Sequence, residues 1–356
     1  MRITAADVPA LERGVALLGS GGGGDTVTVA VLLRRLLESG REPAVVGVAD
    51  LPPDTLVVPI GIVGATAALT EKLPSGDEMA SAVAAIQRWT GQRAQALMTI
   101  EIGGLNGLLP LAAAAELGLP YADADLCGRG LPRLDQASVA ATGRGMAPAA
   151  MAEPGGQVVV LASASDAAVE DGVRAFLVSS GGWAAIALAP IPAGELAENT
   201  VLATTSQALA LGRRALAAGE NPDLPTLETA LRGRVLARGR VLEVSRHVGP
   251  GERGRPGFGR GSATLADHRD GALLRLEMEN EYLLALRDGL PVASTPDILS
   301  VLDRRTGVPL QCDLIRAGVE VDVVCLAAAP FWTDPRRRPL LEPRAYGIDC
   351  DPVVAG

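Results

Sequence analysis

Residues 19–25 read Gly-Ser-Gly-Gly-Gly-Gly-Asp, and this run constrains the fold more than any other segment of the chain. Consecutive glycines lose much backbone entropy on ordering, so a folded protein keeps them where φ is positive or where another group lies against bare backbone. Helical periodicity begins at Thr26, and Asp25 occupies the N-cap position. A helix N-terminus presents free N–H groups that favour anions and polarised oxygens. A flexible turn capped by Asp25 is the alternative. The loop residues that we expect to bind substrate are Gly21, Gly22, Gly23, Gly24 and Asp25.

The loop matches neither of the common nucleotide-binding motifs. A phosphate loop ends in Gly-Lys-Ser/Thr, and no lysine follows the glycines here. A dinucleotide-binding fingerprint requires a hydrophobic strand before the loop, whereas Leu11, Val15 and Leu18 follow helical spacing. We therefore predict that a helix, the glycine loop and a second helix follow one another.

The composition indicates a globular protein and argues against some classes of partner. A length of 356 residues fits two domains, and 48% hydrophobic residues with 3% aromatics predict aliphatic cores. The net charge of −9 argues against nucleic acid or an anionic membrane as a partner. We find no secretory leader, no membrane-spanning stretch and no CxxC pair, so we expect free thiols and a cytoplasmic location. The apolar second half favours a homo-oligomer.

Strand-like and helix-like segments alternate over residues 1–155, which predicts an α/β domain with a mostly parallel sheet. A stretch rich in Gly, Pro, Met and Ala at 143–156 marks the expected domain boundary. Residues 156–356 predict an α+β domain, with a long helix over 196–219 and antiparallel strands after residue 234. In open α/β sheets, ligands bind outside the carboxyl ends of strands, so polar residues that follow strands are candidates for a site.

Polar groups follow two of the predicted strands beside glycine turns. Glu101 and Asn106 surround the first turn, and Asp123 and Asp125 precede the second. In an extended strand the two aspartates point to the same side, where their repulsion raises one pKa unless a cation lies between them. These carboxylates suit a general base, and Asp123 and Asp125 are the candidate ligands of a divalent Zn, Mg or Mn ion. The expected catalytic residues are Asp123, Asp125 and Glu101.

Further candidates lie elsewhere in the chain. Glu281 ends a β-patterned segment. Cys127 stands close to Arg129, and a Cys127 nucleophile with a lowered thiol pKa is an alternative to the carboxylates. Only two histidines occur, which excludes a three-histidine zinc site. His247 lies near the arginine- and glycine-rich stretch 251–261, which we interpret as a lid that binds a carboxylate or as a solvated hairpin tip. The further residues expected to bind substrate are Asn106, Arg129 and Glu281.

Several of these segments together resemble the S-methyl-thiohydantoin desulfurase family, which is associated with hydantoinase/oxoprolinase proteins. The segments are residues 19–25, 101–107, 123–132, 280–283 and 296–298. The resemblance implies an N-terminal α/β domain and a C-terminal domain with more β structure. It also implies hydrolytic removal of a sulfur substituent from a five-membered thiohydantoin-type ring, which gives a hydantoin and a thiol. The chain departs from the family pattern at 127–131, which predicts a different pocket wall.

A hydrolytic mechanism fits these residues. Water must be deprotonated or activated by a metal before it attacks the ring carbon that carries sulfur. Asp123 or Asp125 would serve as base or metal ligand, Glu101 and Asn106 would hold the ring, and the loop N–H groups would hold developing charge. Asp125→Asn is then expected to abolish turnover and leave the fold intact. Two other classes remain open: a biosynthetic enzyme that condenses or cyclises a related small molecule, and a metabolite-binding protein.

Overall fold

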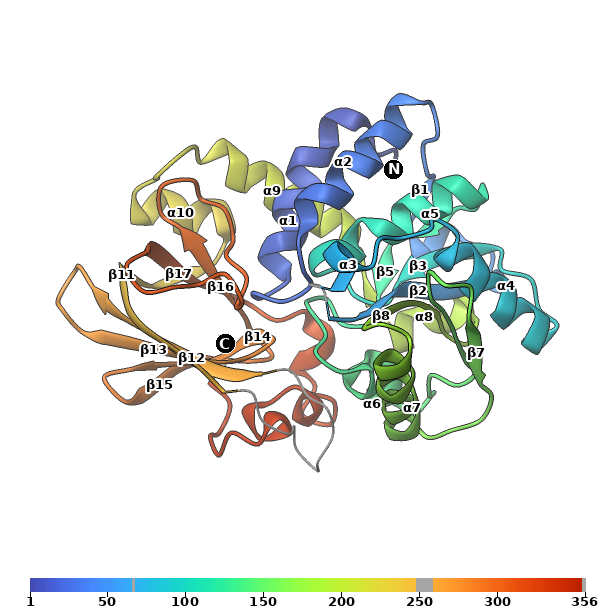
Figure 1. The fold of residues 1–356 in the computed structure, drawn as a ribbon. Helices are drawn as coiled ribbons and strands as arrows, with labels where there is room; N and C mark the ends of the chain where they lie inside the picture. Colours follow the sequence, from blue (N-terminus) through green and yellow to red (C-terminus); the bar gives the residue numbers. More distant parts are fainter. Residues whose placement is uncertain (66–67, 248–258, 354–356) are drawn as a thin grey trace.

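The computed structural model describes residues 1–65, 68–247 and 259–353 (Figure 1). The helices are α1 Val8–Leu18, α2 Thr26–Glu38, α3 Ala68–Glu71, α4 Glu78–Thr90, α5 Leu109–Leu117, α6 Ser138–Thr142, α7 Asp166–Ser179, α8 Ala193–Asn199, α9 Thr204–Ala217 and α10 Leu224–Leu231. The strands of the first half are β1 Val45–Val46, β2 Leu56–Gly64, β3 Ala96–Thr99, β4 Tyr121–Ala122, β5 Ala124–Asp125, β6 Ala149–Ala152, β7 Val158–Leu161, β8 Trp183–Ala187, β9 Ile191–Pro192 and β10 Val201–Leu202. The strands of the second half are β11 Arg234–His247, β12 Arg260–Asp267, β13 Leu273–Glu279, β14 Glu281–Arg287, β15 Leu290–Ser294, β16 Ile298–Asp303 and β17 Glu320–Leu326.

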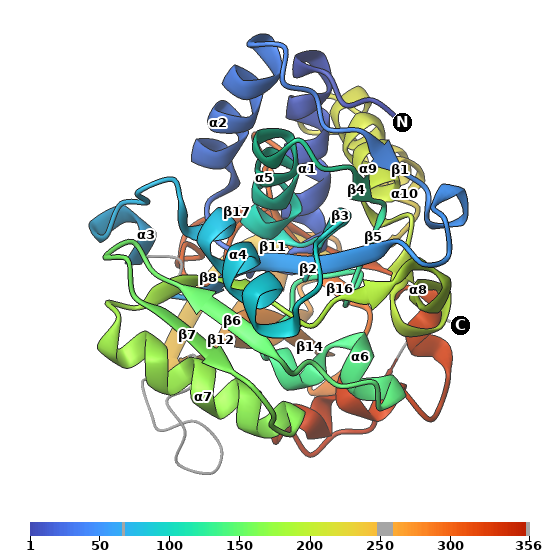
Figure 2. The same ribbon diagram turned by 90° about the vertical axis from the view of Figure 1, so that its right-hand side faces the viewer.

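The N-terminal sheet has the strand order β1-β4-β3-β2-β8-β6-β7 and is covered by helices on both faces (Figure 2). Strands β1, β4, β3 and β2 pair in parallel, and β8, β6 and β7 continue the sheet in antiparallel pairings. One face packs against α2, α4 and α5, and the other packs against α6, α7 and α8. Because both faces are buried, β2 and β3 are almost continuously apolar.

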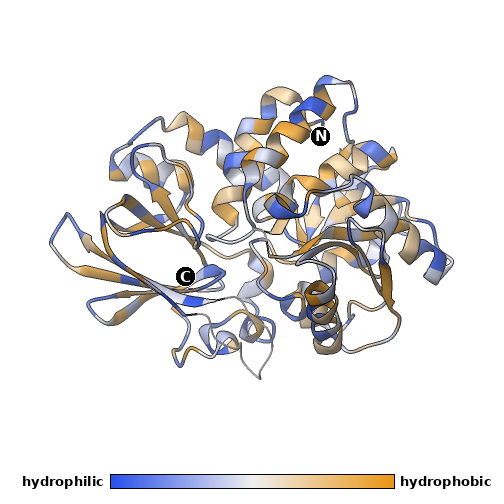
Figure 3. Cartoon of the chain, viewed as in Figure 1, coloured by the Kyte–Doolittle hydropathy of each residue, from blue (hydrophilic) through white to orange (hydrophobic). Residues whose placement is uncertain are grey.

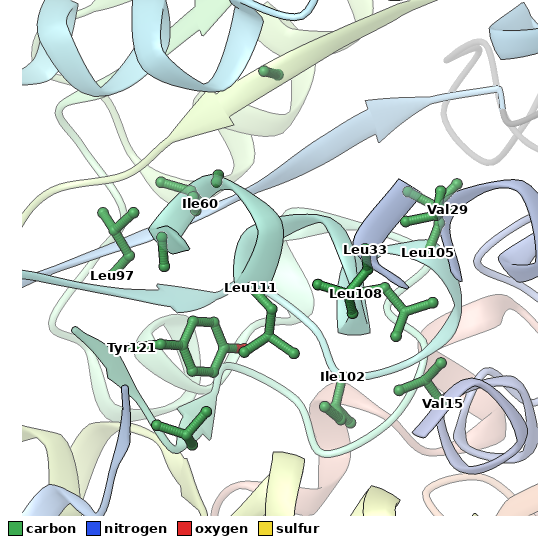
Figure 4. Packing of buried hydrophobic residues seen from close by; sticks show 14 of the residues in the cluster. Val15, Val29, Leu33, Ile60, Leu97, Ile102, Leu105, Leu108, Leu111 and Tyr121 are labelled. Carbon is green, nitrogen blue, oxygen red and sulfur yellow. The ribbon is translucent and has the colours of Figure 1, made fainter. Parts of the chain in front are cut away.

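The hydrophobic core on the sheet face covered by α2, α4 and α5 also packs α1 and α2 against the turn that follows β3. Figure 4 shows Val15 of α1 and Val29 and Leu33 of α2 close to Leu105 and Leu108. These side chains are almost completely buried, and aliphatic packing of this kind contributes about 1.5–3 kcal/mol per large side chain. The helices on either side of the glycine loop are thereby fixed to the sheet edge where β3 ends.

The C-terminal sheet is entirely antiparallel, with the order β15-β14-β13-β12-β11-β17-β16. Strands β14 and β16 also contact each other although they are distant in this order, so the sheet curls around its own core. Figure 3 shows mainly apolar strands and hydrophilic hairpin ends in this half. Residues 327–353 lie below the junction of the two halves (Figure 1) and contact both, since the side-chain amide of Gln136 donates to the carbonyl of Leu340 and Ser294 N–H donates to that of Val353.

Helices α1 and α9 join the two halves through a close crossing. A Cβ atom on Gly14 would lie 1.9 Å from the carbonyl oxygen of Ala208, and one on Gly212 would lie 1.6 Å from that of Ala10. Neither distance is sterically allowed, so these two glycines permit the helix backbones to touch. This contact explains a glycine in the interior of α9, where it otherwise lowers helix stability by about 1 kcal/mol relative to Ala.

The predicted α/β class, with an antiparallel C-terminal portion, is confirmed. The predicted helix over 196–219 is wrong in one respect, because α8 ends at Asn199 and α9 begins at Thr204. Between them β10 pairs with β5, and Ala203 adopts φ of 60°. Strands β6 and β7, which lie on opposite sides of the expected domain boundary at 155, pair in one sheet. That boundary stays a prediction.

Candidate active site

The glycine loop lies where the two halves of the molecule meet. Its backbone binds the C-terminal sheet on one side, because Tyr282 N–H donates to the carbonyl of Ser20 (2.7 Å) and Cys312 N–H donates to that of Gly21 (2.8 Å). On the other side, Leu105 N–H donates to the carbonyl of Gly23 (2.8 Å). The loop is therefore a junction between the halves as well as a potential ligand surface.

Close approach of neighbouring groups explains the successive glycines. Gly21 and Gly23 have φ of 84° and 77°, a region that favours glycine. A Cβ atom on Gly21 would lie 2.4 Å from the Tyr282 ring, and one on Gly23 would lie 2.7 Å from the Cα of Gly104. The predicted N-cap is confirmed, since the carboxylate of Asp25 accepts a hydrogen bond from Val27 N–H (3.0 Å).

A cleft opens beside this junction, at the ends of β2 and β3 and at the turn between β13 and β14. It contains about 620 Å³ of empty space when the part open to solvent is counted. The cleft brings together residues that are remote in the chain and that include several predicted site residues. Its polar lining residues are Glu101, Asn106, Arg174, Asn280 and Glu281, and its other lining residues are Gly23, Ile62, Val63, Gly64, Ala65, Leu69, Ile100, Leu105, Leu131, Pro132 and Leu134.

Glu101 is held in the cleft wall by two donors. The side-chain amide of Asn106 donates to Oε1 (2.7 Å), and the N–H of Leu131 donates to Oε2. Asn106 is itself fixed, because its amide also exchanges hydrogen bonds with the backbone of Ile62 (2.7 and 2.9 Å). Burial raises the pKa of Glu101 to about 7, while the two hydrogen bonds and the positive charge of Arg129 oppose that shift. Glu101 can therefore exchange a proton near neutral pH.

Glu281 faces the same cleft from the C-terminal half. Asn280 has φ of 61° and forms the turn before β14, and its side-chain amide donates to Oε1 of Glu281 (2.9 Å). Burial raises the pKa of Glu281 well above its ordinary value, and the negative charge of Glu101 adds to this shift while Arg129 opposes it. Burial thus favours the protonated form of Glu281 as it does that of Glu101.

Arg129 ties the loop after β5 to the C-terminal half. Its fully buried guanidinium donates from Nη1 to Thr295 Oγ1 (2.9 Å) and to the carbonyls of Pro296 (3.1 Å) and Asp297 (3.0 Å). Its Nε donates to the carbonyl of Gly130 (3.3 Å). The predicted substrate-binding arginine thus lies behind the cleft, where its charge acts on both carboxyl groups.

Asp125 lies behind Glu101 and is not among the residues that line the cleft. Its oxygens accept hydrogen bonds from the N–H groups of Ile102 (2.7 Å) and Gly128 (2.8 Å), which fixes the turns after β3 and β5. Burial raises the pKa of Asp125 to about 8, the backbone donors oppose the shift, and the charge of Glu101 adds to it. With this geometry Asp125 is placed to position the loop that carries Arg129.

Asp125→Asn is therefore expected to lower the free energy of unfolding by about 1–3 kcal/mol, because its NH₂ group would face a backbone N–H donor. The Asp125 carboxyl titrates near 3.8 when unfolded and near 8 when folded. Between these two pH values the native state binds more protons at this group than the unfolded state does, so the free energy of unfolding falls as pH rises. Thermal melts between about pH 5 and about pH 8 should show this fall in the wild type and a shallower one in the variant. The exposed Asp54→Asn is the control, and an equal slope in Asp125→Asn would contradict the assignment.

Asp123 faces a different part of the molecule. Its carboxylate accepts hydrogen bonds from the N–H groups of Thr205 (2.8 Å) and Ser206 (3.3 Å) and from the hydroxyl of Ser206, at the start of α9. Like Asp125, it thus holds backbone donors. Within residues 1–65, 68–247 and 259–353, no three His, Cys, Asp or Glu side chains gather as a metal site. The donor set around Asp123 and Asp125 does not fit the proposed metal ion.

The remaining predicted candidates are placed as follows. Cys127 is buried, and burial raises the pKa of its thiol well above the ordinary value, which disfavours a thiolate nucleophile. All four cysteines are free thiols. His247 lies at the exposed end of β11 and contacts Ser245. Most of the predicted lid at 251–261 lies outside the described residues. Across the described helices, none has the length and hydrophobicity to span a membrane.

The sequence analysis did not identify Asn280, whose amide holds Glu281. It also did not identify Tyr346 of the 3₁₀ helix Pro343–Tyr346, whose buried hydroxyl has no hydrogen-bond partner among the described residues. An asparagine between two strand-like segments is a turn signal that could have marked the first. No local pattern marks Tyr346, because its position depends on how the last residues fold back.

The fold and the cleft define a two-part α/β protein with paired carboxyl groups at the junction of its halves. The family described as S-Me-THD-like matches the chain with its N-terminal domain at residues 6–163 and its C-terminal domain at residues 164–354. The chain therefore belongs to the S-Me-THD-like family. A crystal structure of a protein from Chromobacterium violaceum has the same fold, with a TM-score of 0.78, 23% identity and coverage of 100% of this chain and 99% of that chain. Comparison with curated proteins gives no match.

Proposed function

We propose that the protein is a hydrolase that replaces the thioether substituent of a small five-membered thiohydantoin-type ring with oxygen. The observation that carries this proposal is the pair Glu101 and Glu281, which line one cleft from opposite halves of the molecule. Burial raises the pKa of Glu101 to about 7, and it raises the pKa of Glu281 well above its ordinary value. Two carboxyl groups tuned in this way form a base and an acid.

In the proposed reaction, ionised Glu101 takes a proton from water as its oxygen bonds to the ring carbon that carries sulfur. Protonated Glu281 gives its proton to the adjacent ring nitrogen, so the negative charge does not accumulate there. The new hydroxyl then returns its proton to Glu281 as the carbon–sulfur bond breaks, and the departing thiolate takes the proton held by Glu101. The net change consumes one water and yields a hydantoin and a thiol, with both carboxyl groups restored.

Incubation with an S-methyl-thiohydantoin tests this function directly. We expect enzyme-dependent release of one thiol per hydantoin formed, detected with a thiol-reactive dye, and incorporation of oxygen from ¹⁸O-labelled water into the hydantoin carbonyl. A condensing or cyclising enzyme would release no thiol from this substrate. A metabolite-binding protein would show a ligand-induced rise in melting temperature without product, and either result would contradict the proposal.

A further inference from the structure

Buried side chains from three segments each leave one polar atom without a hydrogen-bond partner among the described residues. The atoms are Nη2 of Arg129, Oε2 of Glu281 and the hydroxyl of Tyr346. Each of these side chains is about 1% exposed. Leaving a polar group unsatisfied in a protein interior is unfavourable, so three such atoms on side chains that interact electrostatically point to one shared partner.

Tyr346 is linked through Arg260 to the turn that presents Glu281 to the cleft. Arg260 donates from Nη2 to the carbonyl of Tyr346 and from Nε to Glu279 (3.0 Å), which pairs with Glu281 across that turn. The segment that contains Tyr346 is thereby tied to β12 and to Glu279 at the end of β13, next to the turn before Glu281.

Arg129 reaches the same place from the N-terminal half. Gly130, whose carbonyl accepts from Arg129, packs so closely on Glu281 that a Cβ atom there would lie 3.3 Å from Glu281 Oε1. Burial raises the pKa of the Tyr346 phenol, the charge of Arg129 lowers it, and that of Glu281 raises it. Both charged groups are therefore within electrostatic reach of the phenol.

We propose that Arg129, Glu281 and Tyr346 form an inner subsite that binds the amide edge of a five-membered cyclic substrate. The Nη2 of Arg129 and the hydroxyl of Tyr346 donate to a ring carbonyl oxygen, and Oε2 of Glu281 faces the ring nitrogen next to that carbonyl. This assignment rests on the proposed function for its substrate class. It also gives the donors a chemical role, because charge that develops on the ring nitrogen spreads onto the neighbouring carbonyl oxygen, where fixed donors stabilise it.

The subsite can be tested with unreactive ligands and one conservative variant. Hydantoin carries the carbonyl that Tyr346 is assigned to bind, whereas 2-imidazolidinone keeps a five-membered ring and two ring N–H groups but lacks that carbonyl. In Tyr346→Phe we expect hydantoin affinity, measured by calorimetry, to fall about tenfold, and 2-imidazolidinone affinity to stay unchanged. The melting temperature should be unchanged or higher, because the variant removes a hydroxyl that makes no hydrogen bond within the described chain.

Tyr121→Phe is the matched control, since it removes an equally buried hydroxyl from the N-terminal core and should leave both affinities unchanged. Equal affinity of Tyr346→Phe and wild type for hydantoin would overturn the subsite, as would an equal loss for both ligands. These outcomes are distinct from failure of the proposed function. Selective hydantoin binding without thiol release from the methylated substrate would leave the subsite standing and remove the desulfurase assignment.

Discussion

Thiol release by Glu101→Gln is expected to fall by about 10²–10⁴-fold in kcat, because glutamine keeps the size of the side chain but cannot accept a proton from water. Oε1 of the new amide can still accept from Asn106, but its NH₂ group would face the N–H of Leu131, so we also expect the free energy of unfolding to fall by about 1–3 kcal/mol. The folded variant should still bind hydantoin while it fails to turn over the substrate. Thiol release at saturating substrate measures turnover, and a thermal melt with and without hydantoin measures whether the folded variant still binds the ligand.

The pH dependence of the wild type provides an independent check on the same residue. Glu101 is ionised only above its pKa of about 7, so kcat/KM should rise as pH increases through that value. The exposed Glu116→Gln, on a helix of the same half, is the control and should show the wild-type profile. A Glu101→Gln variant with more than about a tenth of wild-type kcat would exclude Glu101 as the base.

Local patterns were sufficient to predict much of the fold. A helix on each side of the glycine loop was expected from periodicity, and Asp25 was expected as the cap of α2; the structure shows both helices and the cap. Both features depend on residues close in sequence, where helical spacing and capping chemistry are decided. The break between α8 and α9 was missed because it depends on residues that are remote in the sequence. Helical periodicity continues on both sides, and the break is stabilised by the pairing of Val201 with Asp125, which is remote in the chain.

The candidate site was likewise predicted where it depends on local sequence and missed where it depends on contacts between remote segments. Glu101 and Asn106 were expected at the site from their positions around a glycine turn, and Glu281 was expected from its place at the end of a β-patterned segment. All three line one cleft. The expected common orientation of Asp123 and Asp125 assumed one extended strand, whereas β4 ends before Asp123 and β5 begins after it. Each aspartate then takes backbone donors from a different neighbour. Which donors these are depends on the packing of α9 and the turn after β3, and neither is encoded near residue 123.

Gly22→Ala is expected to lower kcat/KM by about 10²-fold with a smaller effect on stability, because it displaces Glu281 from the cleft wall. A Cβ atom at this position would lie 2.4 Å from Oε1 of Glu281, 2.8 Å from its Cγ and 3.0 Å from Nδ2 of Asn280. These are side-chain atoms that can move, so overpacking should reduce the free energy of unfolding by only about 1–3 kcal/mol. Gly40→Ala provides the control, since nothing lies within 4 Å of its Cβ position and its φ of 84° adds a conformational penalty without touching the cleft. We expect Gly40→Ala to be less stable than wild type and fully active. If Gly22→Ala kept wild-type kcat/KM, the close contact between the glycine loop and Glu281 would have no part in placing the acid, and the loop would serve only to join the two halves.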